Sequence, residues 1–365
     1  MGGLLSHSGM ERSFVTLLVC FALSFGILSN GFGLFKAKPR SYSAQIKAAD
    51  TIQILNQNVF DEKNITNDAM GMKAIANILP DLSNFAHKAD GAGIGYIGGS
   101  AEWSSAALMG AFGSYRSGAD LVHVFCPPDA ADIIRALSPE LVIFPTLKAV
   151  LGDDLGDAWK GLKHLNGLVI APSDRDENKL NLFRLIIEKS IEYDQTVVVD
   201  TNGLWYMTQL YKQHKLPADR SRFLLTPNHA EYSSMAKSFH AKVPSKFAAA
   251  LEGDGSGPGL ALMKKGAIDE VYGKDKDDTI IVAVQGTPRR CLFQGDMLAG
   301  IVATFGVFAR MRDASLLEGA AAASCLMRMS AHRAYNRKGR AMIASDIMAE
   351  IPGVLQDVDA GRYNS

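Results

Sequence analysis

Short apolar runs alternate with longer polar and apolar segments along most of this chain. The runs are apolar at successive positions, as expected for strands that are covered on both faces of a parallel sheet. They predict strands at residues 94–97, 120–125, 141–144, 167–170, 196–199, 222–225, 260–263 and 279–284. Between two of them, residues 178–193 carry apolar side chains at helical spacing, at Leu180, Phe183, Ile187 and Ile191. This alternation predicts an α/β fold with a doubly wound, mostly parallel sheet and helices on both faces.

The N-terminal part of the chain follows a different pattern. Residues 14–28 contain no charge, and Lys36, Lys38 and Arg40 follow them. The apolar stretch has the length typical of a signal peptide, and extension to residue 35 brings it close to a membrane span. We therefore expect a hydrophobic targeting or anchor segment at 1–35, a linker at 36–65 and a single domain at 66–360. Attachment through residues 14–35 predicts an organellar, secretory-pathway or membrane-anchored protein.

Composition narrows the classes of partner. The chain is 47% hydrophobic and 21% charged, which is ordinary for a globular protein. Its 38 basic residues balance 38 acidic ones, so no net field favours nucleic acid as a partner. The four cysteines, Cys20, Cys126, Cys291 and Cys325, are widely spaced and form no zinc pattern, so we predict no metal-ligating set. The sequence is compatible with either a monomer or a homo-oligomer.

The most informative segment is residues 286–300. Gly295 and Asp296 follow a predicted strand and stand at the entry to an apolar, small-residue-rich helix predicted at 297–311. Free backbone N–H groups and the helix dipole favour an anion at such a position. Asp296 either caps the helix, a role that aspartate favours, or takes a proton from a hydroxyl that attacks a phosphate.

Four further polar clusters follow predicted strands and are therefore expected to share one edge of the sheet, where ligands bind in α/β folds. Three of the four have two interpretations. Gly98–Ser100 lets a phosphate approach the backbone or is a plain turn, and Asp200 holds magnesium or a hydroxyl or caps the segment 203–206. The segment 226–231 forms a polar helix start that contacts a ligand, and Lys265 reaches a phosphate or lies in a solvated hairpin. Together these clusters favour a nucleotide site.

Ten blocks of residues carry a resemblance to a known family between about residue 74 and about residue 351. They include Gly93–Gly99, Gly118–Cys126, Leu225–Glu231, Lys265–Gly266 with Asp269, Pro288–Cys291, Gln294–Leu298 and Ser345–Asp346. In this order and spacing they resemble the ATP-dependent NAD(P)H-hydrate dehydratases, a branch of the ribokinase-like superfamily, of which this chain looks like a divergent member. The resemblance implies a hydro-lyase that repairs hydrated NADH and NADPH, with ATP and Mg²⁺ as cofactors. Phosphorylation of the C6 hydroxyl and elimination of phosphate would restore the reduced cofactor.

The resemblance also implies roles for individual residues. Asp296 would be the catalytic base, and the Gly295 amide would stabilise the developing charge. ATP would contact Lys265, Gly266, Ala267, Ile268 and Asp269, and also Gly286, Thr287, Pro288, Arg289, Arg290, Cys291, Leu292, Phe293, Gln294 and Gly295. The hydrated cofactor would contact Asn228, His229, Ala230, Glu231, Tyr232, Ser233, Ser234 and Asp296.

The chain departs from the family pattern at several glycines. Ala171-Pro-Ser-Asp-Arg175 stands where the family has Gly-Pro-Gly-Leu-Gly, so the ligand-binding role of that turn is not assigned to this chain. Asn202 replaces a carboxylate, Ala89 replaces a glycine, and Leu292–Phe293 replaces a Gly-Gly pair in the anion loop. These changes keep two alternatives open: a catalytically weakened or inactive nucleotide-binding homologue, or a ribokinase-like small-molecule kinase.

Overall fold

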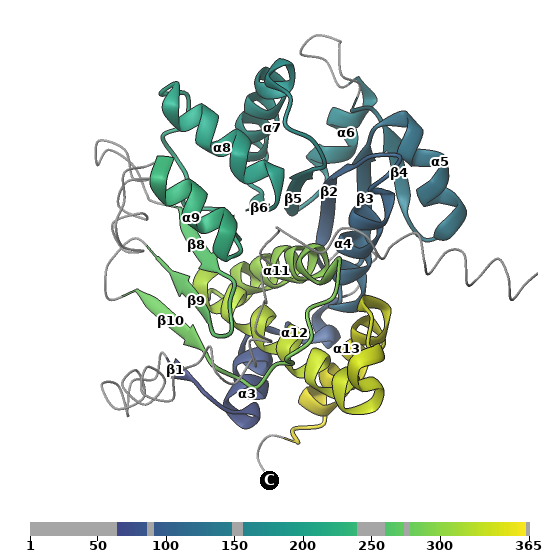
Figure 1. Cartoon of the computed structure of the whole chain (residues 1–365), viewed down its shortest axis with the longest axis vertical. Coiled ribbons are helices and arrows are strands. Elements are labelled where there is room, and N and C mark those ends of the chain that lie inside the picture. Colours follow the sequence, from purple (N-terminus) through teal and green to yellow (C-terminus); the bar gives the residue numbers. More distant parts are fainter. Residues whose placement is uncertain (1–63, 86–90, 148–155, 239–259, 274–277, 363–365) are drawn as a thin grey trace, which may run out of the picture. The chain divides into compact units, whose positions relative to one another are not determined.

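The computed structural model describes residues 64–85, 91–147, 156–238, 260–273 and 278–362, all of which belong to one compact unit (Figure 1). Their centre is a ten-stranded sheet in the order β1-β10-β9-β8-β7-β6-β5-β2-β3-β4. Within it, only β9 runs antiparallel to its neighbours. The strands are β1 (Asn64–Ile65), β2 (Gly93–Gly99), β3 (Leu121–Cys126), β4 (Val142–Pro145), β5 (Gly167–Pro172), β6 (Thr196–Val199), β7 (Phe223–Leu225), β8 (Ala261–Lys264), β9 (Asp269–Tyr272) and β10 (Thr279–Val282).

The predicted strands are confirmed, with ends that differ by no more than two residues. Two strands were not predicted. β1 lies at the end of the expected linker and pairs with β10, and β9 forms an antiparallel hairpin with β8. β9 was not predicted because one of its buried positions is the carboxylate Asp269, which interrupts the apolar pattern of a strand.

Two helical layers cover the sheet. One core contains side chains from α3 (Asp68–Ile78), α4 (Ser104–Arg116), α5 (Pro128–Leu137), α11 (Gln294–Met311), α12 (Leu316–Lys338) and α13 (Ala344–Asp359). The other contains side chains from α6 (Asp157–Lys163), α7 (Leu180–Glu192), α8 (Asn202–Lys212) and α9 (His229–Ser238). Short 3₁₀ turns occur at Leu82–Asn84, Glu177–Lys179 and Gly339–Ala341.

Strand β6 shows why both layers form. Val198 packs into the first core, whereas Val197 and Val199 pack into the second, so the strand is apolar on both faces. The doubly wound α/β architecture predicted from the sequence is therefore confirmed. The turn-rich loop near residues 253–259, which the sequence places before β8, lies outside the described residues.

Contact between the backbones of α4 and α11 fixes the start of α11. A Cβ on Gly300 would lie 2.0 Å from the carbonyl oxygen of Gly110, and one on Gly113 would lie 2.3 Å from that of Met297. The Ser114 hydroxyl donates to the Gly300 carbonyl at 3.1 Å across the same contact. Only glycine permits so close a crossing, which holds the first turn of α11 beside the end of β2.

The expectation of a membrane anchor requires correction. Within the described residues, no helix combines the length and the apolar character needed to cross a bilayer. Residues 14–35 themselves lie outside the described residues. Organellar, secretory or membrane-anchored localisation through this segment is therefore unsupported.

Candidate active site

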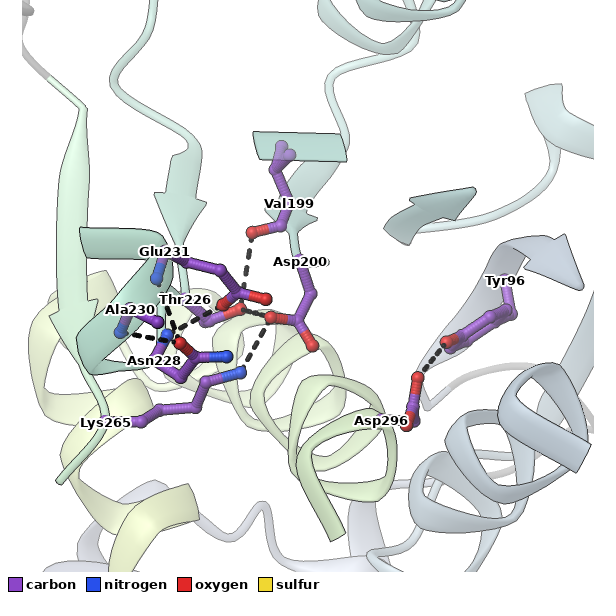
Figure 2. Close-up of polar contacts among 9 residues, drawn as sticks. All are labelled: Tyr96, Val199, Asp200, Thr226, Asn228, Ala230, Glu231, Lys265 and Asp296. Carbon is purple, nitrogen blue, oxygen red and sulfur yellow. Dashed lines mark hydrogen bonds and ion pairs between the residues drawn. The ribbon is translucent and has the colours of Figure 1, made fainter. Parts of the chain in front are cut away.

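Asp296 lies in the first turn of α11, and it does not cap the helix. The helix begins at Gln294, three residues earlier than predicted, because Phe293 precedes it in the left-handed conformation with φ 66°. Asp296 is thus the third helical residue, and its Oδ1 accepts a hydrogen bond of 3.4 Å from the hydroxyl of Tyr96, which lies in the middle of β2 (Figure 2). Of the two interpretations of Asp296, the capping role is wrong.

The surroundings of Asp296 favour its protonated form more than water does. Burial raises the pKa of Asp296 from 3.8 to about 6, and the nearby Asp200 carboxylate adds to the rise, while Lys265 opposes it. A carboxylate with a pKa near 6 is ionised at neutral pH yet basic enough to accept a proton from an alcohol. Asp296 has the properties of a general base.

A second polar group lies across the ends of β6, β7 and β8. Asp200 follows β6 and is fully buried, and its Oδ1 accepts hydrogen bonds from Thr226 Oγ1 at 2.9 Å and Lys265 Nζ at 2.7 Å (Figure 2). Its Oδ2 is buried without a hydrogen-bond partner among the described residues. A buried oxygen without a hydrogen bond destabilises the folded protein by about 1–3 kcal/mol. Unpaired buried groups of this kind are typical of ligand-binding sites.

This arrangement decides the alternatives for Asp200 and Lys265. The Asp200 side chain does not cap α8, because only its backbone carbonyl accepts from the Gly203 N–H and Thr201 stands at the cap. Lys265 does lie in a hairpin, between β8 and β9, but its ammonium group points to the site and not to solvent. Its Nζ is 3.6 Å from the point that a Cβ on Gly295 would occupy, so a positive charge adjoins the predicted anion loop.

The two glycines after β2 have structural reasons of their own. A Cβ on Gly98 would lie 2.2 Å from the carbonyl oxygen of Ala171, and Gly99 has φ 89°. Both positions therefore require glycine whether or not a phosphate binds there, and the plain-turn interpretation accounts for them.

The segment predicted to bind the hydrated cofactor begins α9 with a reciprocal cap. Asn228 Oδ1 accepts from the backbone N–H groups of Ala230 and Glu231, and Glu231 Oε2 accepts from the Asn228 N–H. Glu231 also lies close enough to Asp200 and Lys265 to interact with both charges, and burial raises its pKa. Asn228, His229, Ala230 and Ser234 are exposed, whereas Tyr232 packs on the second core and Ser233 bonds back to His229.

The two segments predicted to bind ATP are joined to each other. One Arg290 guanidinium donates to the carbonyl oxygens of Thr287 at 2.9 Å and Gly266 at 3.2 Å. Gly266 and Ala267 are exposed and Ile268 is half-buried, and in the other segment Pro288 and Arg289 are exposed. The Gln294 side chain accepts from the N–H of Cys291, whose thiol contacts the Met342 carbonyl.

Both carboxylate oxygens of Asp269 accept hydrogen bonds that hold the loop at residues 265–269. Its Oδ1 accepts from the Gly266 N–H at 2.7 Å, and its Oδ2 accepts from Ser324 at 2.7 Å and Arg328 at 3.1 Å. Arg328, on α12, also donates to the carbonyl oxygens of Val284 and Ala267. Asp269 therefore fixes the conformation of the loop at residues 265–269 through contacts with α12.

A cavity of about 370 Å³ opens beyond the ends of β2 and β5. Its floor is formed by the turn Gly98–Ser100 and its walls by Trp103 and the apolar side of α7, including Phe183 and Ile186. Pro172, Ser173 and Asp174 line it as well, so the turn that departs from the family glycines lies at its edge. The cavity is large enough for a ring and sugar of a nucleotide.

Leu292 and Phe293, the bulky pair in the anion loop, do not fill the loop. Leu292 is 66% exposed, and Phe293 turns toward Trp103. The loop therefore remains accessible beside Gly295.

Sequence reasoning missed three supporting residues: Tyr96, Thr226 as a partner of Asp200, and Arg328. Tyr96 reads as a core residue of an apolar strand and indeed is fully buried apart from its hydroxyl contact. Arg328 belongs to α12, far from any motif in the sequence, and only the packing of α12 against β9 and β10 brings it to Asp269. Thr226 was noted only as part of the polar segment that follows β7.

The described residues form no preassembled set of side-chain ligands for magnesium. Among the described residues, no group of three or more His, Cys, Asp or Glu side chains is arranged to hold a metal ion. Phosphate oxygens and water usually supply most ligands of magnesium in nucleotide sites, with one or two carboxylates, and the unpaired Asp200 Oδ2 is a carboxylate oxygen of this kind.

Comparison with known proteins agrees with this geometry. The profile of the NAD(P)H-hydrate dehydratase family matches residues 94–353. The chain belongs to the NAD(P)H-hydrate dehydratase family. The ATP-dependent (S)-NAD(P)H-hydrate dehydratase of Entamoeba histolytica is 32% identical over 293 residues, which cover 78% of this chain and 93% of that protein.

Solved structures of family members and their superfamily share the fold. A ribokinase-like superfamily protein from Enterococcus faecalis aligns with a TM-score of 0.65 at 14% identity, over 82% of this chain and 98% of its own. The ADP/ATP-dependent NAD(P)H-hydrate dehydratase of Bacillus subtilis, co-crystallised with ATP/Mg²⁺, aligns with a TM-score of 0.56 at 17% identity, over 79% and 97%. The ribokinase-like fold predicted from the sequence is confirmed.

Proposed function

We propose that this protein removes water from hydrated NADH and NADPH and consumes ATP in doing so. The observation that carries the proposal is Asp296, a half-buried carboxylate in the first turn of α11, with the pKa of a general base at about 6. It contacts the Tyr96 hydroxyl, and the residue before it, Gly295, lies beside the positively charged Lys265. Membership of the NAD(P)H-hydrate dehydratase family supports the choice of substrate.

The first step is a phosphoryl transfer. The C6 hydroxyl oxygen of the hydrated ring attacks the γ-phosphorus of ATP, its proton passes to the Asp296 carboxylate, and ADP leaves. The Gly295 N–H and the positive end of α11 stabilise negative charge on the transferring group, and Lys265 adds a fixed cation close by. These groups are in place before the reaction, so little reorganisation is needed.

The second step is an elimination that needs no further cofactor. The lone pair of the ring nitrogen expels phosphate from C6, and loss of a proton from C5 completes the double bond of the dihydronicotinamide. Phosphate is a far better leaving group than hydroxide, which is why ATP is consumed. The sum is hydrate plus ATP giving reduced cofactor, ADP, phosphate and a proton.

For the ATP site we propose the loops Lys265–Asp269 and Gly286–Gly295, and for the hydrated cofactor the cavity together with the start of α9. Arg290 donates hydrogen bonds to both ATP loops, which supports the proposal that they form one binding surface. Magnesium would be held by the phosphates of ATP and would neutralise their charge. The capped start of α9 contributes the exposed Asn228 and His229.

The test is direct. The full chain is incubated with hydrated NADH, ATP and magnesium, and recovery of dihydronicotinamide absorbance is followed. We expect ATP-dependent recovery that Asp296→Asn lowers by about 10²–10⁴-fold, the range for loss of a general base. Binding of ATP without recovery would favour the inactive homologue, and phosphate retained on another metabolite would favour a small-molecule kinase.

A matched control separates loss of the base from loss of the fold. Asp359 is also a helical aspartate, at the far end of α13, and belongs to no part of the site. Asp359→Asn should leave recovery unchanged. Equal loss in both variants would point to damage to the protein as a whole.

A further inference from the structure

Phe293 is held in an unusual backbone conformation. Among the described residues, five non-glycine residues have positive φ: Asp194, Thr201, His214, Phe293 and Asp313. Aspartate and histidine tolerate this region because their short polar side chains bond locally, but a bulky hydrocarbon side chain does not. Strain of this kind persists where it serves a site.

The ring that this conformation presents is paired with a second aromatic ring. Phe293 and Trp103 meet edge to face, with ring centroids 6.4 Å apart and planes at 75°. Trp103 is 48% exposed, and Phe293 is only partly buried. Large exposed aromatic surface next to a cavity is typical of sites that bind flat ligands.

The pair links the cavity to the first turn of α11, because Trp103 lines the cavity and contacts Phe293. Trp103 follows β2 and lines the cavity of about 370 Å³, whereas Lys265 follows β8. Four strand spacings separate β2 from β8 in the sheet, or about 19 Å at about 4.8 Å each. Phe293 precedes Asp296 by only three residues, so a ring against it lies close to the base.

We propose that Trp103 and Phe293 bind the nicotinamide-derived ring of the substrate and hold its hydroxyl-bearing carbon beside Asp296. This proposal rests on the proposed function, since it names which part of that substrate meets which side chains. Phe293 belongs to the loop Gly286–Gly295 proposed for ATP, but its ring contacts Trp103, so we expect the backbone of that loop to serve ATP and the ring to serve the nicotinamide-derived ring. In the anion loop, Phe293 stands where the family has a flexible glycine, and its side chain provides an aromatic surface that the substrate ring can contact.

The test compares affinities, so it does not depend on turnover. Dissociation constants of the full chain are measured for NADPH, for reduced nicotinamide mononucleotide and for ATP. Phe293→Gly removes the ring and relieves the left-handed strain. We expect about threefold to tenfold weaker binding of both nicotinamide ligands, the range for loss of one aromatic contact, and less than about twofold change for ATP. Trp103→Leu should have the same pattern, and Phe293→Tyr should retain wild-type affinity.

The melting temperature distinguishes this role from simple packing. His214 also has positive φ, at 54°, and is exposed in the turn after α8, so His214→Gly relieves strain without touching the site. We expect both glycine variants to melt at or above the wild-type temperature, and only Phe293→Gly to lose nicotinamide affinity. A lower melting temperature for Phe293→Gly with unchanged affinities would show that the ring only packs, and would overturn the proposal.

Two further outcomes separate this proposal from the proposed function. Equal weakening of ATP and nicotinamide ligands in Phe293→Gly would mean that the whole loop has moved, which also overturns the pair as a specific ring site. If the wild type binds NADPH but does not dehydrate the hydrate, the proposed function fails while the affinity comparison still decides the role of the pair. If the wild type binds neither nicotinamide ligand, the pair is not such a site.

Discussion

Lys265 Nζ lies 2.7 Å from Asp200 Oδ1, and this ion pair joins the ends of β8 and β6 across the intervening strand β7. The Asp200 side chain is 1% exposed and that of Lys265 is 16% exposed. Burial alone would lower the pKa of Lys265, but the carboxylates of Asp200, Glu231 and Asp296 outweigh it and raise that pKa. The ammonium group is therefore charged before ATP arrives.

Removal of the Lys265 charge should destabilise the protein strongly. In Lys265→Met, Asp200 keeps a buried charge without its partner, which costs about 3–5 kcal/mol. The neighbouring Lys264 offers a control, since its ion pair with Glu270 is more exposed, at 23% and 27%. Lys264→Met should cost no more than about 1 kcal/mol in chemical unfolding. Similar losses in the two variants would contradict a special role for the buried pair.

The pH profile of turnover should show an acid limb near pH 6. The parameter kcat/KM reports the free protein, in which Asp296 has a pKa of about 6 and must be ionised to act as a base. Activity should therefore fall about tenfold per pH unit below that value and level off above it. A profile flat down to pH 5 would argue against Asp296 as the base.

The position of that limb should respond to Asp200. The Asp200 carboxylate raises the pKa of Asp296, second only to burial, so Asp200→Asn should move the limb to lower pH. Lys265 lowers the same pKa, so Lys265→Met should move the limb to higher pH. Opposite shifts from two partners of one ion pair are not expected from general damage to the fold. Rates are measured from pH 5 to pH 8 on variants whose folding is checked by circular dichroism.

Asp296 should also limit stability. Its pKa in the folded protein exceeds the ordinary value of 3.8, so the folded state is most favoured when the group is protonated, and this contribution is lost as pH rises through about 6. Asp296→Asn removes the buried charge and should raise the free energy of unfolding at pH 8 by on the order of 1–3 kcal/mol. The gain should shrink toward pH 4. A variant less stable than the wild type at pH 8 would show that the carboxylate is needed structurally.

The sequence predicted the architecture well because strands covered on both faces are apolar at successive positions. Runs such as Thr196–Val199 are apolar at every position, and the short turns after them place polar residues at one edge of the sheet. For the same reason the sequence predicted Asp200 and Lys265 at one edge of the sheet, where they form an ion pair. The reaction was predicted from the family resemblance, because the spacing of apolar residues carries no information about chemistry.

What the sequence did not yield depends on contacts between distant segments. Asp296 looked equally suited to capping because the left-handed Phe293, which starts α11 early, has no signature in the sequence. Asp269 remains a predicted ATP contact, but the sequence did not reveal that Arg328 and Ser324 on α12 bond to its carboxylate. Such pairings follow from how α12 packs against the sheet, and a single chain carries no local pattern for them.

Arg328 should matter for both stability and ATP. In Arg328→Met, the carbonyl oxygens of Val284 and Ala267 and the buried Asp269 lose their donor, which should cost about 3–5 kcal/mol. The KM for ATP should rise because the Lys265–Asp269 loop loses its support, while kcat changes less. The double variant Arg328→Met with Asp269→Asn should be less destabilised than the sum of the two single variants, because no buried charge remains unpaired. Additive losses in chemical unfolding would contradict a direct pairing.

The contact between α4 and α11 gives the last prediction. In Gly300→Ala the new Cβ would meet the Gly110 carbonyl oxygen at 2.0 Å, so the two helices must separate, at a cost of at least about 2 kcal/mol. Because α11 carries Asp296 in its first turn, separation should also lengthen the Tyr96–Asp296 contact and lower turnover. Gly353, inside α13, is a matched control: a Cβ there has its nearest neighbour, an Arg333 side-chain nitrogen, at 3.6 Å, so Gly353→Ala should stabilise the helix by about 0.5–1 kcal/mol. If Gly300→Ala proved as well tolerated as Gly353→Ala in thermal unfolding and turnover, the close crossing would not be what positions the base.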